Sequence, residues 1–180
     1  MSLLTLTALL LGLHVAISDM TARRVSNRAL LTVLGVVALA QMISLAEGAA
    51  PSPSIGQCLL GGVIGLLVLL PFHAIGWMGA GDVKLFSTIG FLLGTKALLP
   101  IWVFASLAAG GHALLVVAWP LVAGSLTAIT GPLSARPAPA WLHHWQRDLR
   151  VARQGRSGIP YAAYLGLAMI GYTLIGGGHV

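Results

Sequence analysis

Two aspartates stand at the edges of apolar segments, where their carboxyl groups could do chemistry together. The 180-residue chain has only four acidic residues: Asp19, Glu47, Asp82 and Asp148. A carboxylate at the edge of a membrane segment is costly and is usually retained for function. Two carboxyls held a few ångströms apart cannot both ionise easily, so one keeps its proton while the other acts as a base on water. We therefore expect Asp19 and Asp82 to form a catalytic pair that titrates as one coupled unit.

The residues just before Asp82 suit a site that another segment must approach. Gly79 and Gly81 flank Ala80, so the backbone there carries little side-chain bulk. Lys84 follows two positions later and either assists Asp82 and binds substrate or anchors the chain at the membrane interface. The alternative interpretation makes Asp82 a helix cap and Asp19 a loop residue paired with Arg23 or Arg24.

The composition is that of an integral membrane protein. Hydrophobic residues make up 57% of the chain and charged residues 8%, and the mean hydropathy is +0.92. A soluble domain of this size needs more polar surface. The single cysteine, Cys58, excludes a disulfide within the chain and a cysteine-cluster zinc site. The net charge of +6 comes from residues that flank apolar segments, so we expect contact with membrane lipid and not with nucleic acid.

The apolar segments predict an all-α, polytopic membrane helix bundle with about six transmembrane helices, forming a single domain over residues 1–180. The expected spans are 3–18, 29–45, 55–73, 83–94, 97–119 and 159–175. Residues 19–28 and 74–82 are expected to be loops, and Pro120 is expected to end or kink its span. Residues 121–130 remain open between a continuation, a re-entrant piece and an interfacial helix.

The basic residues predict the orientation of these spans. Nine of the ten fall on one side when residues 19–28, 74–84 and 131–158 are placed together, and only Lys96 falls opposite. By the positive-inside rule that side is cytoplasmic, which puts both termini outside. Asp19 and Asp82 then share the cytoplasmic face. The nine residues are Arg23, Arg24, Arg28, Lys84, Arg136, Arg147, Arg150, Arg153 and Arg156.

Three stretches resemble the motifs of one known family. The run from Gly79 to Leu85, Gly-Ala-Gly-Asp-Val-Lys-Leu, resembles the Gly-x-Gly-Asp motif of the type IV prepilin peptidases, in which the aspartate is catalytic. The run from Asp19 to Asn27 resembles their first motif, an aspartate followed by basic residues and Ile-Pro-Asn, with Ser26 in place of the proline. Ile159-Pro160-Tyr161 resembles their C-terminal segment.

This resemblance implies an aspartic endopeptidase of the bacterial inner membrane, with its active site on the cytoplasmic side. Its substrate would be a prepilin or pseudopilin, from which it removes the basic leader peptide. Asp19 and Asp82 would be catalytic and would need no metal or nucleotide cofactor. The chain lacks the paired Cys-x-x-Cys motifs of the family's bifunctional members, so it resembles the short peptidase-only branch of Flp/Tad systems, without N-methyltransferase activity. Residues expected to bind substrate or shape the site are Gly79, Gly81, Lys84, Asn27 and Arg24. The oligomeric state is left open.

Two other functions compete with this reading. Presenilin-like and signal-peptide-peptidase-like enzymes also use Gly-x-Gly-Asp, but their first aspartate usually follows a tyrosine and a Pro-Ala-Leu motif comes later. Here Ser18 precedes Asp19, and Pro-Ala-Leu is absent. A small transporter would use the two aspartates as ion sites near the membrane midplane, whereas here both are predicted at one face.

Overall fold

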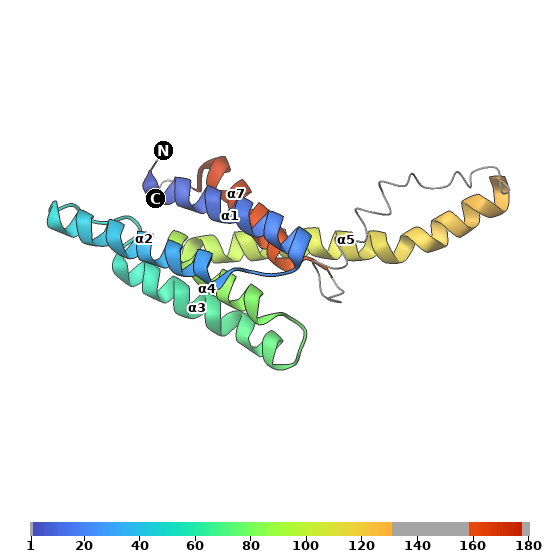
Figure 1. Ribbon diagram of the computed structural model, residues 1–180, viewed down its shortest axis with the longest axis horizontal. Helices are drawn as coiled ribbons and strands as arrows, with labels where there is room; N and C mark the ends of the chain where they lie inside the picture. Colours follow the sequence, from blue (N-terminus) through green and yellow to red (C-terminus); the bar gives the residue numbers. More distant parts are fainter. Residues whose placement is uncertain (1, 131–158, 178–180) are drawn as a thin grey trace.

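The computed structural model describes residues 2–130 and 159–177, and all regular structure in these residues is helical. The elements are α1 (Leu3–Ala22), α2 (Asn27–Ala46), α3 (Ile55–Ala74), α4 (Ala80–Leu93), α5 (Thr95–Thr130), α7 (Tyr161–Tyr172) and a π-helical turn, η2 (Thr173–Gly177) (Figure 1). The expected all-α class is confirmed. Residues 131–158, predicted to be a polar segment, lie outside the described ranges.

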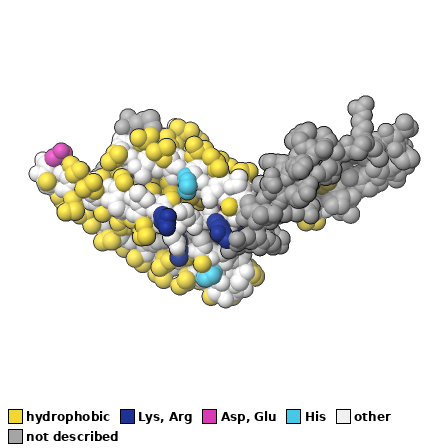
Figure 2. Space-filling model, in the orientation of Figure 1, with side chains coloured by type: hydrophobic (Ala, Val, Ile, Leu, Met, Phe, Trp, Pro, Cys, Tyr) yellow, Lys and Arg dark blue, Asp and Glu magenta, His cyan; other side chains and the backbone are white. Residues whose placement is uncertain are grey.

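Four of these segments are long and apolar enough to cross a membrane: Leu3–Ala22, Asn27–Ala46, Ile55–Ala74 and Thr95–Trp119. Tyr161–Ile175 is a shorter apolar helix. Helix α4 has 14 residues, about 21 Å of length, less than the ~30 Å of a hydrocarbon core. Apolar side chains are spread over the described part of the face drawn in Figure 2, and Leu31 is 66% exposed. Such a surface suits contact with lipid, and the protein is a multi-pass membrane protein.

Two close helix crossings build the frame around the aspartates. Helix α1 packs antiparallel along α7, where a Cβ on Gly166 would lie 2.7 Å from the carbonyl oxygen of Gly12. Helix α3 packs along α4, where a Cβ on Gly61 would overlap the Gly90 carbonyl. Only glycine permits such approach. The first crossing carries Asp19 and the second carries Asp82.

The connection between α1 and α2 is shorter than predicted, because α1 continues through Asp19 to Ala22. No helix breaker follows Asp19, and the Thr21 hydroxyl donates to the Ile17 carbonyl at 2.7 Å. Arg23 ends the helix in the left-handed region, at φ 53°, with its N–H donating to the Asp19 carbonyl at 3.2 Å. The prediction that Asp19 opens a loop is therefore wrong, since it lies in the last turn of a helix.

Helix α2 begins at the position where Ser26 replaces the proline of the first motif. Ser26 is the N-cap, and its hydroxyl accepts the Ala29 N–H at 3.4 Å. A serine at the N-cap stabilises the same helix start by a hydrogen bond. Asn27 then becomes the first residue of α2.

Two further boundaries differ from the sequence predictions. Helix α4 begins at Ala80, before Asp82, because Gly79 serves as its N-cap in extended conformation. Helix α5 continues past Pro120 to Thr130, so that proline does not end it. Of the three placements left open for residues 121–130, the structure shows the continuation, which projects beyond the other helices in Figure 1.

Candidate active site

The two aspartates line one small cavity of about 220 Å³. Asp19 comes from the end of α1 and is 7% exposed, whereas Asp82 comes from the first turn of α4. Although they lie far apart in sequence, the two helix crossings bring their carboxyls to the same space. The cavity is lined by Asp19, Arg23, Val25, Gly79, Gly81, Asp82, Ile159 and Tyr161.

The first turn of α7 points its backbone N–H groups at this pair. The Ala163 N–H donates to Asp19 Oδ2 at 3.0 Å, and the Ala162 N–H acts on both carboxyls. The N-cap of α7, Pro160, provides no side-chain cap for this helix. The N–H groups that begin a helix need acceptors, and negative charge is favoured there. The two carboxyls therefore serve as the acceptors for the start of α7.

The surroundings of Asp82 raise the pKa of its carboxyl. Its Oδ2 accepts the Gly79 N–H at 3.1 Å. Burial, and after it the nearby charge of Asp19, raise the pKa of Asp82 from its ordinary value of 3.8 to about 6. The N–H groups of Gly79 and Ala162 partly oppose this rise by stabilising the ionised form. One carboxyl of the pair can thus keep its proton up to a pH of about 6.

The two glycines before Asp82 each make room for a different part of the site. A Cβ on Gly79 would lie 3.3 Å from Asp82 Oδ2, tight against the carboxyl. A Cβ on Gly81 would lie 3.3 Å from the Val25 side chain. Val25 belongs to the α1–α2 connection, so Gly81 lets that connection close over the start of α4.

The other predicted site residues do not join the aspartates. Lys84 and Asn27 line a separate cavity of about 370 Å³. Lys84 is two residues after Asp82 on the same helix, so its side chain points about 200° away from that of Asp82. Arg23 lines the aspartate cavity in place of Arg24. The Arg24 carbonyl accepts the Ser18 hydroxyl at 2.7 Å.

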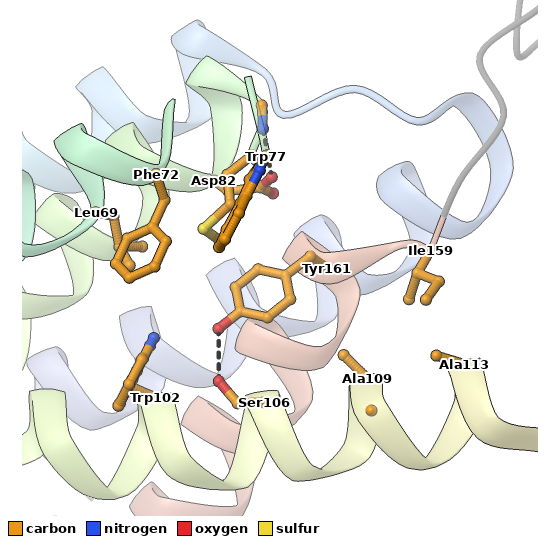
Figure 3. A pocket seen from close by; sticks show the side chains of 13 residues that line it. Leu69, Phe72, Trp77, Asp82, Trp102, Ser106, Ala109, Ala113, Ile159 and Tyr161 are labelled. Atoms are coloured by element: carbon orange, nitrogen blue, oxygen red, sulfur yellow. Dashed lines mark hydrogen bonds between the residues drawn. The ribbon is translucent and has the colours of Figure 1, made fainter. Parts of the chain in front are cut away.

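A larger apolar cavity of about 690 Å³ adjoins the aspartates and shares Gly79, Asp82, Ile159 and Tyr161 with their cavity. Figure 3 shows the Tyr161 ring beside Asp82, with its hydroxyl bonded to Ser106 of α5; the two oxygens are 3.0 Å apart. Sequence reasoning noticed Ile159 to Tyr161 as a motif but assigned them no role. The remaining wall is apolar and aromatic, and includes Leu69, Phe72, Trp77 and Trp102.

These helices and paired carboxyls define a polytopic membrane protein with a two-aspartate site. Residues 5–114, more than half of the chain, match the model of the type IV leader peptidase family, and the chain belongs to this family. It is 39% identical over 95 residues to the prepilin leader peptidase/N-methyltransferase of Bacillus subtilis (strain 168). That alignment covers 52% of this chain and 36% of the relative, so the chain spans about a third of the relative's length. No solved structure matches it.

Proposed function

We propose that this protein is an aspartic endopeptidase that removes the leader peptide from a prepilin or pseudopilin. The observation that carries the proposal is the meeting of Asp19 and Asp82 in one cavity, under the N–H groups of α7. Family membership supports the same reaction. It favours neither the signal-peptide-peptidase-like alternative nor the transporter.

The pair performs general acid–base chemistry on the scissile peptide bond. The ionised carboxyl takes a proton from water as the water oxygen bonds to the peptide carbonyl carbon. The protonated carboxyl donates to the carbonyl oxygen, whose charge grows as the tetrahedral intermediate forms. When the C–N bond breaks, the proton taken from water passes to the leaving nitrogen, and the proton on the former carbonyl oxygen returns to the carboxyl that donated it. The products are a carboxylic acid and an amine, and the pair again shares one proton.

The surroundings of the pair suit a substrate with an apolar segment beside its cleavage site. Gly79 and Gly81 line the aspartate cavity, where an extended peptide would approach the carboxyls. The cavity of about 690 Å³ continues from Asp82 into apolar and aromatic walls, which can receive apolar side chains next to the bond. The basic leader then lies toward the end of the bundle that carries Arg23, Arg24 and Arg28.

We also propose that this end of the bundle faces the cytoplasm, with both termini on the other side of the bacterial inner membrane. Arginines flank the α1–α2 connection here, and basic residues favour the cytoplasmic side. The antiparallel pairing of α1 and α7 supports the same arrangement. It brings the end of α1 to the start of α7 and leaves the start of α1 at the opposite end.

The direct test is cleavage of a co-expressed prepilin by the wild type and by Asp19→Asn and Asp82→Asn. Asparagine keeps the size of the side chain and removes its acid–base function, so we expect no detectable mature pilin with either variant. Glu47→Gln is the matched control, because Glu47 is exposed at the far end of α2, and it should process normally. Normal processing by both aspartate variants, at equal amounts in the membrane, would reject the proposal.

The absence of methyl transfer stays a prediction, since the Bacillus subtilis relative bears both activities in its name. Mass spectrometry of the mature pilin decides it. We expect an unmodified N-terminal amine, and a mass increase of one methyl group would show that the prediction is wrong.

A further inference from the structure

The cavity that contains Lys84 and Asn27 is a site apart from the aspartates. It has a volume of about 370 Å³ and lies where α2, α3 and α4 meet. Its lining residues are Asn27, Leu30, Leu31, Leu34, Leu66, Lys84, Ser87 and Thr88. The chemistry proposed above uses none of them.

The polar and apolar parts of this cavity are separated along its length. Asn27 is the first residue of α2, so it lies at the same end of the bundle as the aspartates. Leu30, Leu31 and Leu34 follow one to two turns further along the helix. The cavity therefore has a polar, cationic end near the membrane edge and an apolar wall that runs toward the membrane interior. Leu31 is 66% exposed and Leu66 is 39% exposed, so the wall opens toward lipid.

The hydrogen-bonding groups that line the cavity leave two donors for an anion. The Ser87 hydroxyl already donates to the Gly62 carbonyl at 2.8 Å, and the Thr88 hydroxyl donates to the Lys84 carbonyl at 2.9 Å. The Lys84 ammonium and the Asn27 amide are thus the donors suited to a ligand. Among the described lining residues none is acidic, so Lys84 gives the cavity a positive charge.

We propose that this cavity binds an anionic phospholipid. The phosphate lies against Lys84 and Asn27, and one acyl chain lies along the leucines of α2 and Leu66 of α3. Basic pockets between membrane helices on the cytoplasmic side have the charge and depth that such headgroups need. The lysine stem can lie along the apolar wall while its ammonium reaches the phosphate.

The test is retention of lipid by the purified full-length protein, taken from nanodiscs of mixed phosphatidylglycerol and phosphatidylcholine and measured by native mass spectrometry. We expect the wild type to retain phosphatidylglycerol preferentially. Lys84→Gln should lower this preference about fivefold, in keeping with the contribution of one basic residue near an anionic surface. Lys96→Gln is the matched control: it removes the same charge from an exposed residue at the start of α5, and retention should be unchanged.

Two further measurements distinguish a bound phospholipid from bound inorganic phosphate. Leu34→Trp keeps the charge of the cavity but fills its apolar part, so it should abolish retention of phosphatidylglycerol. Inorganic phosphate, added as a competitor, should not displace the lipid, because phosphate lacks an acyl chain. An equal loss with Lys96→Gln would show unspecific attraction to charge and overturn the proposal. Displacement by phosphate together with normal retention in Leu34→Trp would also overturn it, in favour of a site for phosphate alone.

Discussion

The carboxyl of Asp82 combines three roles in one side chain. It closes the start of its own helix by accepting the Gly79 N–H, it lies in the cavity of Asp19, and it holds a proton to higher pH than an ordinary aspartate. Each role restricts the others. A side chain that caps a helix is fixed in position, and a fixed carboxyl near a second one is the arrangement that acid–base catalysis needs.

Labelling of Asp82 by a hydrophobic carbodiimide, which reacts with protonated carboxyls, should decline as pH rises through about 6. In Asp19→Asn the midpoint should fall, because the charge that helps to raise the pKa of Asp82 is gone. It should remain above 3.8, because burial is the larger cause. Quantified labelled peptide gives both midpoints, and Asp82→Asn supplies the background. An unchanged midpoint in Asp19→Asn would contradict the proximity of the two carboxyls.

The raised pKa of Asp82 also determines how the free energy of unfolding changes with pH. The native state holds the Asp82 proton more tightly than the unfolded chain does, so the neutral form favours folding. This contribution to the free energy of unfolding is complete below pH 3.8 and is lost as pH rises to about 6. Thermal unfolding in detergent should show the loss between these values, and Asp82→Asn should flatten that part of the profile.

Substitution of Gly79 tests how closely the carboxyl is held. In Gly79→Ala the new Cβ lies 3.3 Å from Asp82 Oδ2, so the carboxyl must shift. We expect processing to fall by roughly tenfold to a hundredfold, as small displacements of catalytic groups do. Gly35→Ala is the control, because a Cβ there meets nothing within 4 Å. Equal rates for the two variants would show that the position of Asp82 tolerates the shift.

At the scale of helices, the site depends on pairs that approach through glycine. The α1–α7 crossing sets the distance from Asp19 to the start of α7. The α3–α4 crossing sets the position of α4 along α3, and with it the position of Asp82. Part of this frame could be predicted: the apolar segments indicated the helices, and Gly61, Gly62 and Gly65 give α3 a face of small residues. The partner of that face could not be predicted, because which helices cross is decided by packing and not by local pattern.

Two substitutions on the same helix separate this crossing from a general effect of removing glycine. In Gly166→Ala the new Cβ lies 2.7 Å from the Gly12 carbonyl oxygen, so α1 and α7 must separate at a cost of about 1–3 kcal/mol. In Gly171→Ala the Cβ meets nothing within 4 Å. We expect a lower midpoint of thermal unfolding and weaker processing in the first variant alone. Equal stability would show that the two helices can move apart freely.

The site itself could be predicted only in part. The side chains that stand out in the sequence could be predicted, and the backbone groups could not, for a physical reason. Asp19 and Asp82 stand out because carboxyls are rare in apolar sequence. The donors from Ala162 and Ala163 carry no such signal, since every residue but proline has a backbone N–H. Lys84 was expected at the site because it is near Asp82 in sequence, but the turn of the helix directs it to another cavity. Position along a helix decides neighbours more than nearness in the chain does.

For the whole molecule, the proposed orientation can be tested by the accessibility of single cysteines. Cys58, the one cysteine of the chain, is buried and can be replaced by alanine as a background. A membrane-impermeant maleimide, applied to spheroplasts, should label Glu47→Cys, at the end of α2 far from the aspartates. It should leave Arg28→Cys, near the aspartates, unlabelled until the membrane is opened. The reverse pattern would place the active site outside.

The bond between Asp19 and Ala163 joins residues 144 positions apart, and this has a consequence for how the protein is made. Both aspartates enter the membrane with the first four helices, long before the ribosome has finished α7. Until that helix inserts, the carboxyls have no Ala162 and Ala163 donors, and the wall formed by Tyr161 is missing. A nascent chain therefore carries both carboxyls before the residues that complete their cavity, so the proposed peptidase activity requires the last helix.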